Sequence, residues 1–115
     1  MENKREALIT AYNYIDNLKN GIEDLSNAIN GGNDEKGIKL IPSISDGLDW
    51  LTQVINLTAD VHMGDVSINS LNEKLEEIIE ALDNEDYILV GDLFNYEIMP
   101  ILDEIKSNIG KLVIS

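Results

Sequence analysis

Cysteine is absent from this 115-residue chain, and histidine occurs once. Without cysteine the chain has no disulfides, no thiolate zinc sites and no cysteine nucleophile. A single histidine also excludes the di-iron sites of helical bundles, which need a glutamate and a histidine three residues apart on each of two helices. The sequence contains no glycine-rich phosphate loop, dinucleotide fingerprint or calcium loop. We therefore expect no cofactor, no metal and no catalytic residue.

Basic residues are scarce, because eight lysines and arginines face 22 aspartates and glutamates, for a net charge of −14. This charge repels nucleic acid backbones and anionic membrane surfaces. Long apolar runs are lacking too, since none approaches the ~20 residues that a membrane-spanning helix requires. The first 20 residues are polar and mixed in charge, without the apolar segment of a signal peptide. We expect a cytoplasmic protein that binds neither nucleic acid nor membrane.

Apolar residues in the first 30 positions recur at steps of three and four, the spacing of one helix face. They are Leu8, Ala11, Ile15, Leu18, Ile22, Leu25 and Ile29. The spacing predicts a helix over residues 3–30. Gly31 and Gly32 are expected to end it, because glycine adopts the left-handed conformation of a helix C-terminus without steric cost.

A second stripe predicts a helix over residues 34–63. Its members are Ile41, Ile44, Leu48, Leu51, Ile55 and Thr58. The start is open, because proline is accepted in the first turn of a helix and is disruptive later. Either the helix starts near Asp34 and bends at Pro42, or a shorter helix starts at Pro42. We favour the longer helix, since Ile38 and Ile41 extend the stripe.

The third predicted helix, over residues 71–83, is short. Ser70 and Glu73 have the spacing of a capping box, in which the serine oxygen accepts from the backbone three residues on and the glutamate reaches back. The expected buried face is Leu71, Leu75, Ile78 and Leu82.

The short third helix constrains the assembly, because the fourth helix must start level with its end. We expect residues 65–69 to run along the bundle in extended form, with Val66 and Ile68 packing inward. Otherwise the segment from Ile105 to Ile114 would project and pair with another subunit.

The fourth predicted helix covers residues 85–112, with Asn84 or Asp86 as its N-cap. Its apolar residues cover most of the circumference in the first half, which indicates a central position. They are Tyr87, Val90, Leu93, Phe94, Ile98, Ile101, Ile105, Ile109 and Leu112. Pro100 removes the hydrogen bond to the Tyr96 carbonyl and is expected to bend the axis.

These four helices predict an all-α fold, an up-down four-helix bundle with a short third helix and proline-bent second and fourth helices. The length fits a single domain over residues 1–115.

Acidic residues are concentrated between residues 65 and 86, which hold eight acids and one lysine. A solvated helix face explains this charge, and a docking surface for a basic partner, with Glu77 and Glu80, is the second interpretation. A third interpretation is a magnesium-dependent enzyme. All-helical nucleotide pyrophosphohydrolases hold magnesium with pairs of acidic residues that are three positions apart on each of two helices. The pairs here lie on one helix, and the fourth helix adds only Asp103 and Glu104.

Asp92, Tyr96 and Glu97 form the other candidate group, since Asp92 and Tyr96 are four apart and Glu97 follows. The structural interpretation is that Tyr96 and Glu97 hydrogen-bond to helix ends or to each other beside the bend at Pro100. The functional interpretation is a site for a partner or ligand.

The run from Asp86 to Leu102, DYILVGDLFNYEIMPIL, resembles the C-terminal part of small uncharacterised helical proteins of low-GC Gram-positive bacteria. Residues 80–82 and 47–51 extend the resemblance. It covers about the C-terminal third of the chain, and it implies a helical bundle of unassigned function.

The sequence therefore predicts no defined activity. We expect a non-enzymatic interaction protein, an adaptor or chaperone-like bundle that works through a groove or an acidic face on an unidentified protein partner. The alternatives are the pyrophosphohydrolase-like enzyme and an acidic mimic of nucleic acid that titrates a basic protein. A homodimer is compatible with the apolar surface.

Overall fold

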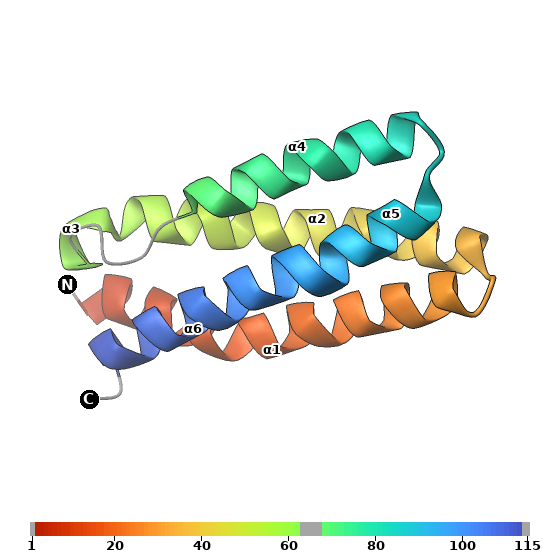
Figure 1. Cartoon of the computed structure of the whole chain (residues 1–115). Coiled ribbons are helices and arrows are strands. Elements are labelled where there is room, and N and C mark those ends of the chain that lie inside the picture. Colours follow the sequence, from red (N-terminus) through yellow and green to blue (C-terminus); the bar gives the residue numbers. More distant parts are fainter. Residues whose placement is uncertain (1, 63–67, 114–115) are drawn as a thin grey trace.

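The computed structural model describes residues 2–62 and 68–113, with the side chains of residues 3–60 and 68–113. These residues form four helical rods that alternate in direction, and they contain no strand (Figure 1). The predicted all-α, up-down four-helix bundle is confirmed. The molecule measures 46 × 21 × 19 Å. The first rod alone spans about 43 Å of the long axis, at 1.5 Å per residue for its 29 residues.

The first rod is α1, Glu2–Asn30, and its predicted stripe is confirmed as buried. Gly32 ends it with a positive φ of 85°, and its N–H donates to the Ile29 carbonyl. The Asn33 N–H donates to the Ala28 carbonyl, so the two bonds together form a Schellman motif. The helix end predicted at Gly31 and Gly32 is therefore closed by backbone hydrogen bonds.

The second rod is α2, Asp34–Leu57, followed by the short α3, Ala59–His62. The Asn33 side chain caps α2 by accepting from the Lys36 N–H, so the helix starts at Asp34 and Pro42 lies inside it, as favoured. The predicted end at residue 63 is wrong, because α2 stops six residues earlier, at Leu57.

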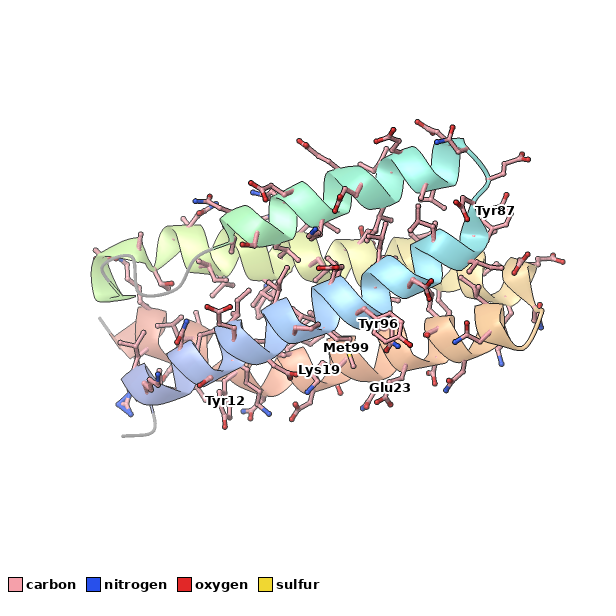
Figure 2. The ribbon with its side chains drawn as sticks, viewed as in Figure 1. Tyr12, Lys19, Glu23, Tyr87, Tyr96 and Met99 are labelled. Atoms are coloured by element: carbon pink, nitrogen blue, oxygen red, sulfur yellow. The ribbon has the colours of Figure 1, made fainter. Side chains whose placement is uncertain are left out.

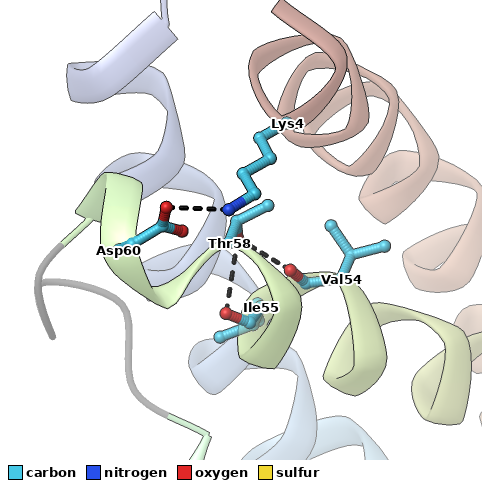
Figure 3. A network of polar contacts seen from close by, with 5 residues as sticks. All are labelled: Lys4, Val54, Ile55, Thr58 and Asp60. Atoms are coloured by element: carbon cyan, nitrogen blue, oxygen red, sulfur yellow. Dashed lines mark hydrogen bonds and ion pairs between the residues drawn. The ribbon is translucent and has the colours of Figure 1, made fainter. Parts of the chain in front are cut away.

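The end of α2 has a local cause at Thr58 (Figure 3). Its buried hydroxyl donates to the Val54 carbonyl at 2.7 Å and lies 3.3 Å from the Ile55 carbonyl oxygen. Such back-bonding competes with the regular helical pattern and often bends the chain. Lys4 of α1 then holds the next turn through an ion pair with Asp60, at 2.7 Å.

The third rod is α4, Asn69–Asp83, and it begins beside the C-terminal part of α2 rather than level with α3 (Figure 1). The predicted capping box is wrong: the N-cap position is Ile68, without a side-chain cap bond, and Ser70 lies inside the helix. The Ile68 carbonyl already accepts from the Asn72 N–H, which starts the helix two residues early. Ile68 packs against the core as expected, but Asn69, the last residue of the expected extended path, is already helical; Val66 and the rest of that path lie outside the described residues.

The fourth rod is continuous but has three parts: α5, Tyr87–Asp92; the π-helical η1, Leu93–Ile98; and α6, Met99–Val113. Asp86 caps it, as predicted, by accepting from the Leu89 N–H. The Met99 N–H donates to the Phe94 carbonyl, five residues back. The fourth helix was expected to bend at Pro100 alone. Instead, a wide π turn directly precedes Pro100.

The π turn keeps the buried stripe of the fourth rod facing the core. Val90, Phe94, Ile98 and Leu102 are all buried and follow one another at steps of four. In an α-helix each such step advances about 40° too far, since a turn has 3.6 residues. The wider turn absorbs this rotation and keeps all four side chains on the core.

The buried residues in the second half of the fourth rod also differ in part from those expected. Leu102 and Val113 are buried in the core where Ile101 and Leu112 were predicted, and the latter two are only partly buried. Two further apolar residues of this rod, Ile88 and Leu89, are exposed.

One hydrophobic cluster draws buried residues from all four rods. α1 packs against α2 and against the whole fourth rod, whereas α4 packs against α5 and η1 and not extensively against α2. Figure 1 shows α4 diverging from α2 toward its C-terminal end. The seam between these two rods is therefore open. None of the helices that the structure describes combines the length and apolar character of a membrane span.

Candidate functional site

Lys74 brings two of the predicted partner-binding residues together. Its Nζ lies 3.0 Å from Oε2 of Glu77 on α4 and 3.7 Å from Oε2 of Glu97 in η1. The hydrogen bond to Glu77 raises the pKa of Lys74, and the nearby negative charges of Glu77, Glu97 and Glu73 raise it further. The lysine therefore stays cationic and ties α4 to the fourth rod.

Glu77 and Glu80 line one small hollow between α4 and α5, with a volume of about 260 Å³. Its other lining residues are Ala81, Asn84, Asp86, Leu89 and Leu93. The hollow combines an apolar part with carboxylates at its edge. The prediction that Glu77 and Glu80 lie on one acidic face is thus consistent with their placement.

Asp92, Tyr96 and Glu97 do not form one cluster. Glu97 faces Lys74 of α4. Tyr96 is 68% exposed and lies on the side of the fourth rod that borders α1, near Lys19 and Glu23 (Figure 2). Of the two expected arrangements, hydrogen bonds to helix ends or between Tyr96 and Glu97, the described residues show neither, and Glu97 pairs with Lys74 instead. The cause is their adjacency on a helix, which points the two side chains in different directions.

Asp103, one of the two acids of the fourth helix proposed to complete a magnesium site, faces another rod. Asp103 forms an ion pair with Lys19 of α1, one turn from the ion pair between Lys106 and Asp16 at 2.7 Å. Lys106 also lies 4.8 Å from the centre of the Tyr12 ring. The α1–α6 face thus uses Asp103 for helix pairing. Among the described residues, no group of three or more acids and histidines is arranged to hold a metal ion.

The hydrogen bond from Lys106 lowers the pKa of Asp16, and the positive charges of Lys106 and Lys19 add to this effect. The same bond raises the pKa of Lys106. Both groups therefore keep their charges over a wider pH range than isolated side chains would.

An apolar groove lies in the open seam between α2 and α4, with a volume of about 260 Å³. The α2 wall includes Ile41, Ser45, Leu48, Asp49 and Thr52, and the α4 wall includes Asn72, Leu75, Ile78, Ile79 and Leu82. The buried ring of Phe94, from η1, also contributes to the lining. Most of the lining atoms belong to aliphatic side chains, yet the groove is open to solvent.

The lining residues of this groove were not among the residues predicted to bind a partner. Leu75 and Leu82 were expected on a buried face, but both are only half-buried, and Ile79 is 59% exposed. The available signal was the Ile78–Ile79 pair, which makes the apolar stripe of α4 wider than contact with one neighbour requires.

Comparison with known proteins places the chain in a family. No curated protein and no solved structure matches it. A family model does match residues 6–108, a wider range than the C-terminal third that the sequence resemblance covered. Since the match spans most of the chain, this protein belongs to the family described as Domain of unknown function (DUF8042).

Proposed function

We propose that this protein is a non-enzymatic, cytoplasmic interaction module, an adaptor or chaperone-like bundle that binds a protein partner. The observation that carries the proposal is the open apolar groove between α2 and α4. The proposal includes an origin in low-GC Gram-positive bacteria, which the resemblance of residues 86–102 supports.

The groove suits a protein segment better than a small molecule. Its volume of about 260 Å³ is below the range of about 300–1,000 Å³ that is typical of ligand pockets. Side chains of a docked helix need only shallow sockets between two rods, as in other helix-in-groove complexes. Contiguous exposed apolar surface is characteristic of interaction sites, and the exposed Ile79 lines the groove together with the half-buried Leu75 and Leu82.

The enzyme alternative receives less support from the geometry. Glu77 and Glu97 share Lys74, and Asp103 pairs with Lys19. Two of the acids that would hold magnesium, Glu77 and Asp103, are therefore engaged with lysines on different faces. The acidic mimic has only the surface charge in its favour.

Site-specific photocrosslinking in the native cell tests the interaction function. A photoreactive phenylalanine analogue replaces Ile79 in one variant and Leu57 in another. Both are exposed aliphatic residues, at 59% and 72%, but only Ile79 lines the groove. We expect a defined protein adduct from position 79 and none from position 57. Identical adducts from both positions, or none from position 79, would refute the proposed function.

A further inference from the structure

We propose that the occupant of the α2–α4 groove is a basic amphipathic helix of a partner protein. This inference rests on the proposed interaction function and adds the chemistry of the partner. It follows from the length of the groove, the polarity of its lining and the charge around it.

The length of the groove fits about three helical turns. Its lining runs from Ile41 to Thr52 on α2 and from Asn72 to Leu82 on α4. Each wall is therefore about 15–16 Å long at 1.5 Å per residue. A helix of that length presents apolar side chains at positions i, i+3 or i+4, and i+7 along one face, and these would contact Leu75, Ile79 and Ile41.

The charge around the groove is negative. Among the described residues that line it, none is basic, and Asp49 is acidic. On α4, the exposed Glu76 and Asp83 stand three residues before and four after Ile79, and so share its side of the helix. Lys74, the basic residue of α4, is turned toward Glu97 instead.

The negative charge around the groove favours a basic partner over a second copy of this chain. Lysines or arginines that flank an apolar stripe would lie opposite Asp49, Glu76 and Asp83, and complementary charges speed and orient docking. A second copy of this chain carries a net charge of −14 and would be repelled. The groove thus favours a basic helix over self-association.

Fluorescence anisotropy with a defined probe tests the inference. The probe is a fluorescein-labelled peptide of about 14 residues, long enough to span the groove, with leucine on one helical face and lysine elsewhere. One comparison peptide has glutamine in place of lysine, and another has the leucine and lysine positions scrambled. We expect the leucine–lysine peptide to bind roughly tenfold or more tightly than either one at low salt.

Matched variants locate the binding. Ile79→Ser should weaken probe binding about tenfold or more, whereas Leu57→Ser, at a still more exposed aliphatic residue outside the groove, should not change it. The double variant Asp49→Asn and Glu76→Gln should remove the preference for lysine over glutamine. The same changes at Asp24 and Glu23 of α1 should leave the preference intact.

Several outcomes would overturn the inference. Equal binding of the scrambled peptide would indicate a general charge effect, and equal weakening by Leu57→Ser would place binding elsewhere. A dimer that Ile79→Ser converts to a monomer in sedimentation velocity would assign the groove to a second copy. If no peptide binds but position 79 still forms an adduct in cells, the partner chemistry is wrong and the interaction function stands.

Discussion

The Nζ of Lys74 on α4 lies 3.7 Å from Oε2 of Glu97 in the π-helical segment. Because α4 does not pack extensively against α2, its position depends on its contacts with α5 and η1. This ionic contact thus helps to set the distance between α4 and α2. The width of the groove follows from that distance.

Replacement of Lys74 by methionine should lower the melting temperature, because Glu77 and Glu97 would then repel each other without a bridging cation. The loss should be largest at low salt and shrink at about 0.5 M NaCl, where surface charges are screened. Thermal unfolding followed by circular dichroism measures this effect. Lys36→Met, at an exposed position of α2, is the control. A loss of equal size at both salt concentrations would contradict the ionic role of Lys74.

Replacement of Gly37 and of Gly21 by alanine should change the free energy of unfolding in opposite directions. A Cβ at Gly37 would lie 2.6 Å from Cγ1 of the buried Ile29, so Gly37→Ala should lower the free energy of unfolding by about 1–3 kcal/mol. A Cβ at Gly21 would meet Ile44 at an ordinary 3.4 Å, so Gly21→Ala should raise it by up to about 1 kcal/mol. Urea denaturation measures both. Equal effects of the same sign would refute the close α1–α2 contact at Gly37.

The Asp16–Lys106 pair predicts an acid-dependent contribution to stability. Because the folded protein lowers the pKa of Asp16, the contribution is complete above the ordinary value of 3.8 and is lost as the pH falls through the lowered value. NMR titration of the side-chain carboxyl carbons should show the Asp16 pKa below 3.8 and its return toward that value in Lys106→Met.

The same contribution should appear in unfolding experiments. Asp16→Asn should flatten the pH dependence of stability in the acid range. Asp24→Asn, an exposed aspartate on the same helix, should leave it unchanged. An Asp16 pKa that is the same with and without Lys106 would contradict the hydrogen bond as the cause.

Two of the five candidate site residues lie as their sequence spacing indicated. Glu77 and Glu80 are three residues apart on one regular helix, so their shared face was predictable, and they do line one hollow. Asp92 and Tyr96 precede and enter a π turn, where a spacing of four no longer has its usual geometry. Lys74 decided the position of Glu97, and nothing local to either residue encodes that contact.

Features that depend on neighbouring residues could be predicted from the amino-acid sequence: the buried stripe of α1, the glycine turn at Gly32 and the cap at Asp86. Helix periodicity, left-handed backbone conformation and capping are all local, so they can be read from a short stretch. The π turn before Pro100, the start of α4 at Asn69 and the open groove emerge only from the packing of the four rods. These features depend on which residues far apart in sequence compete for the same core, and local periodicity carries no information about that competition.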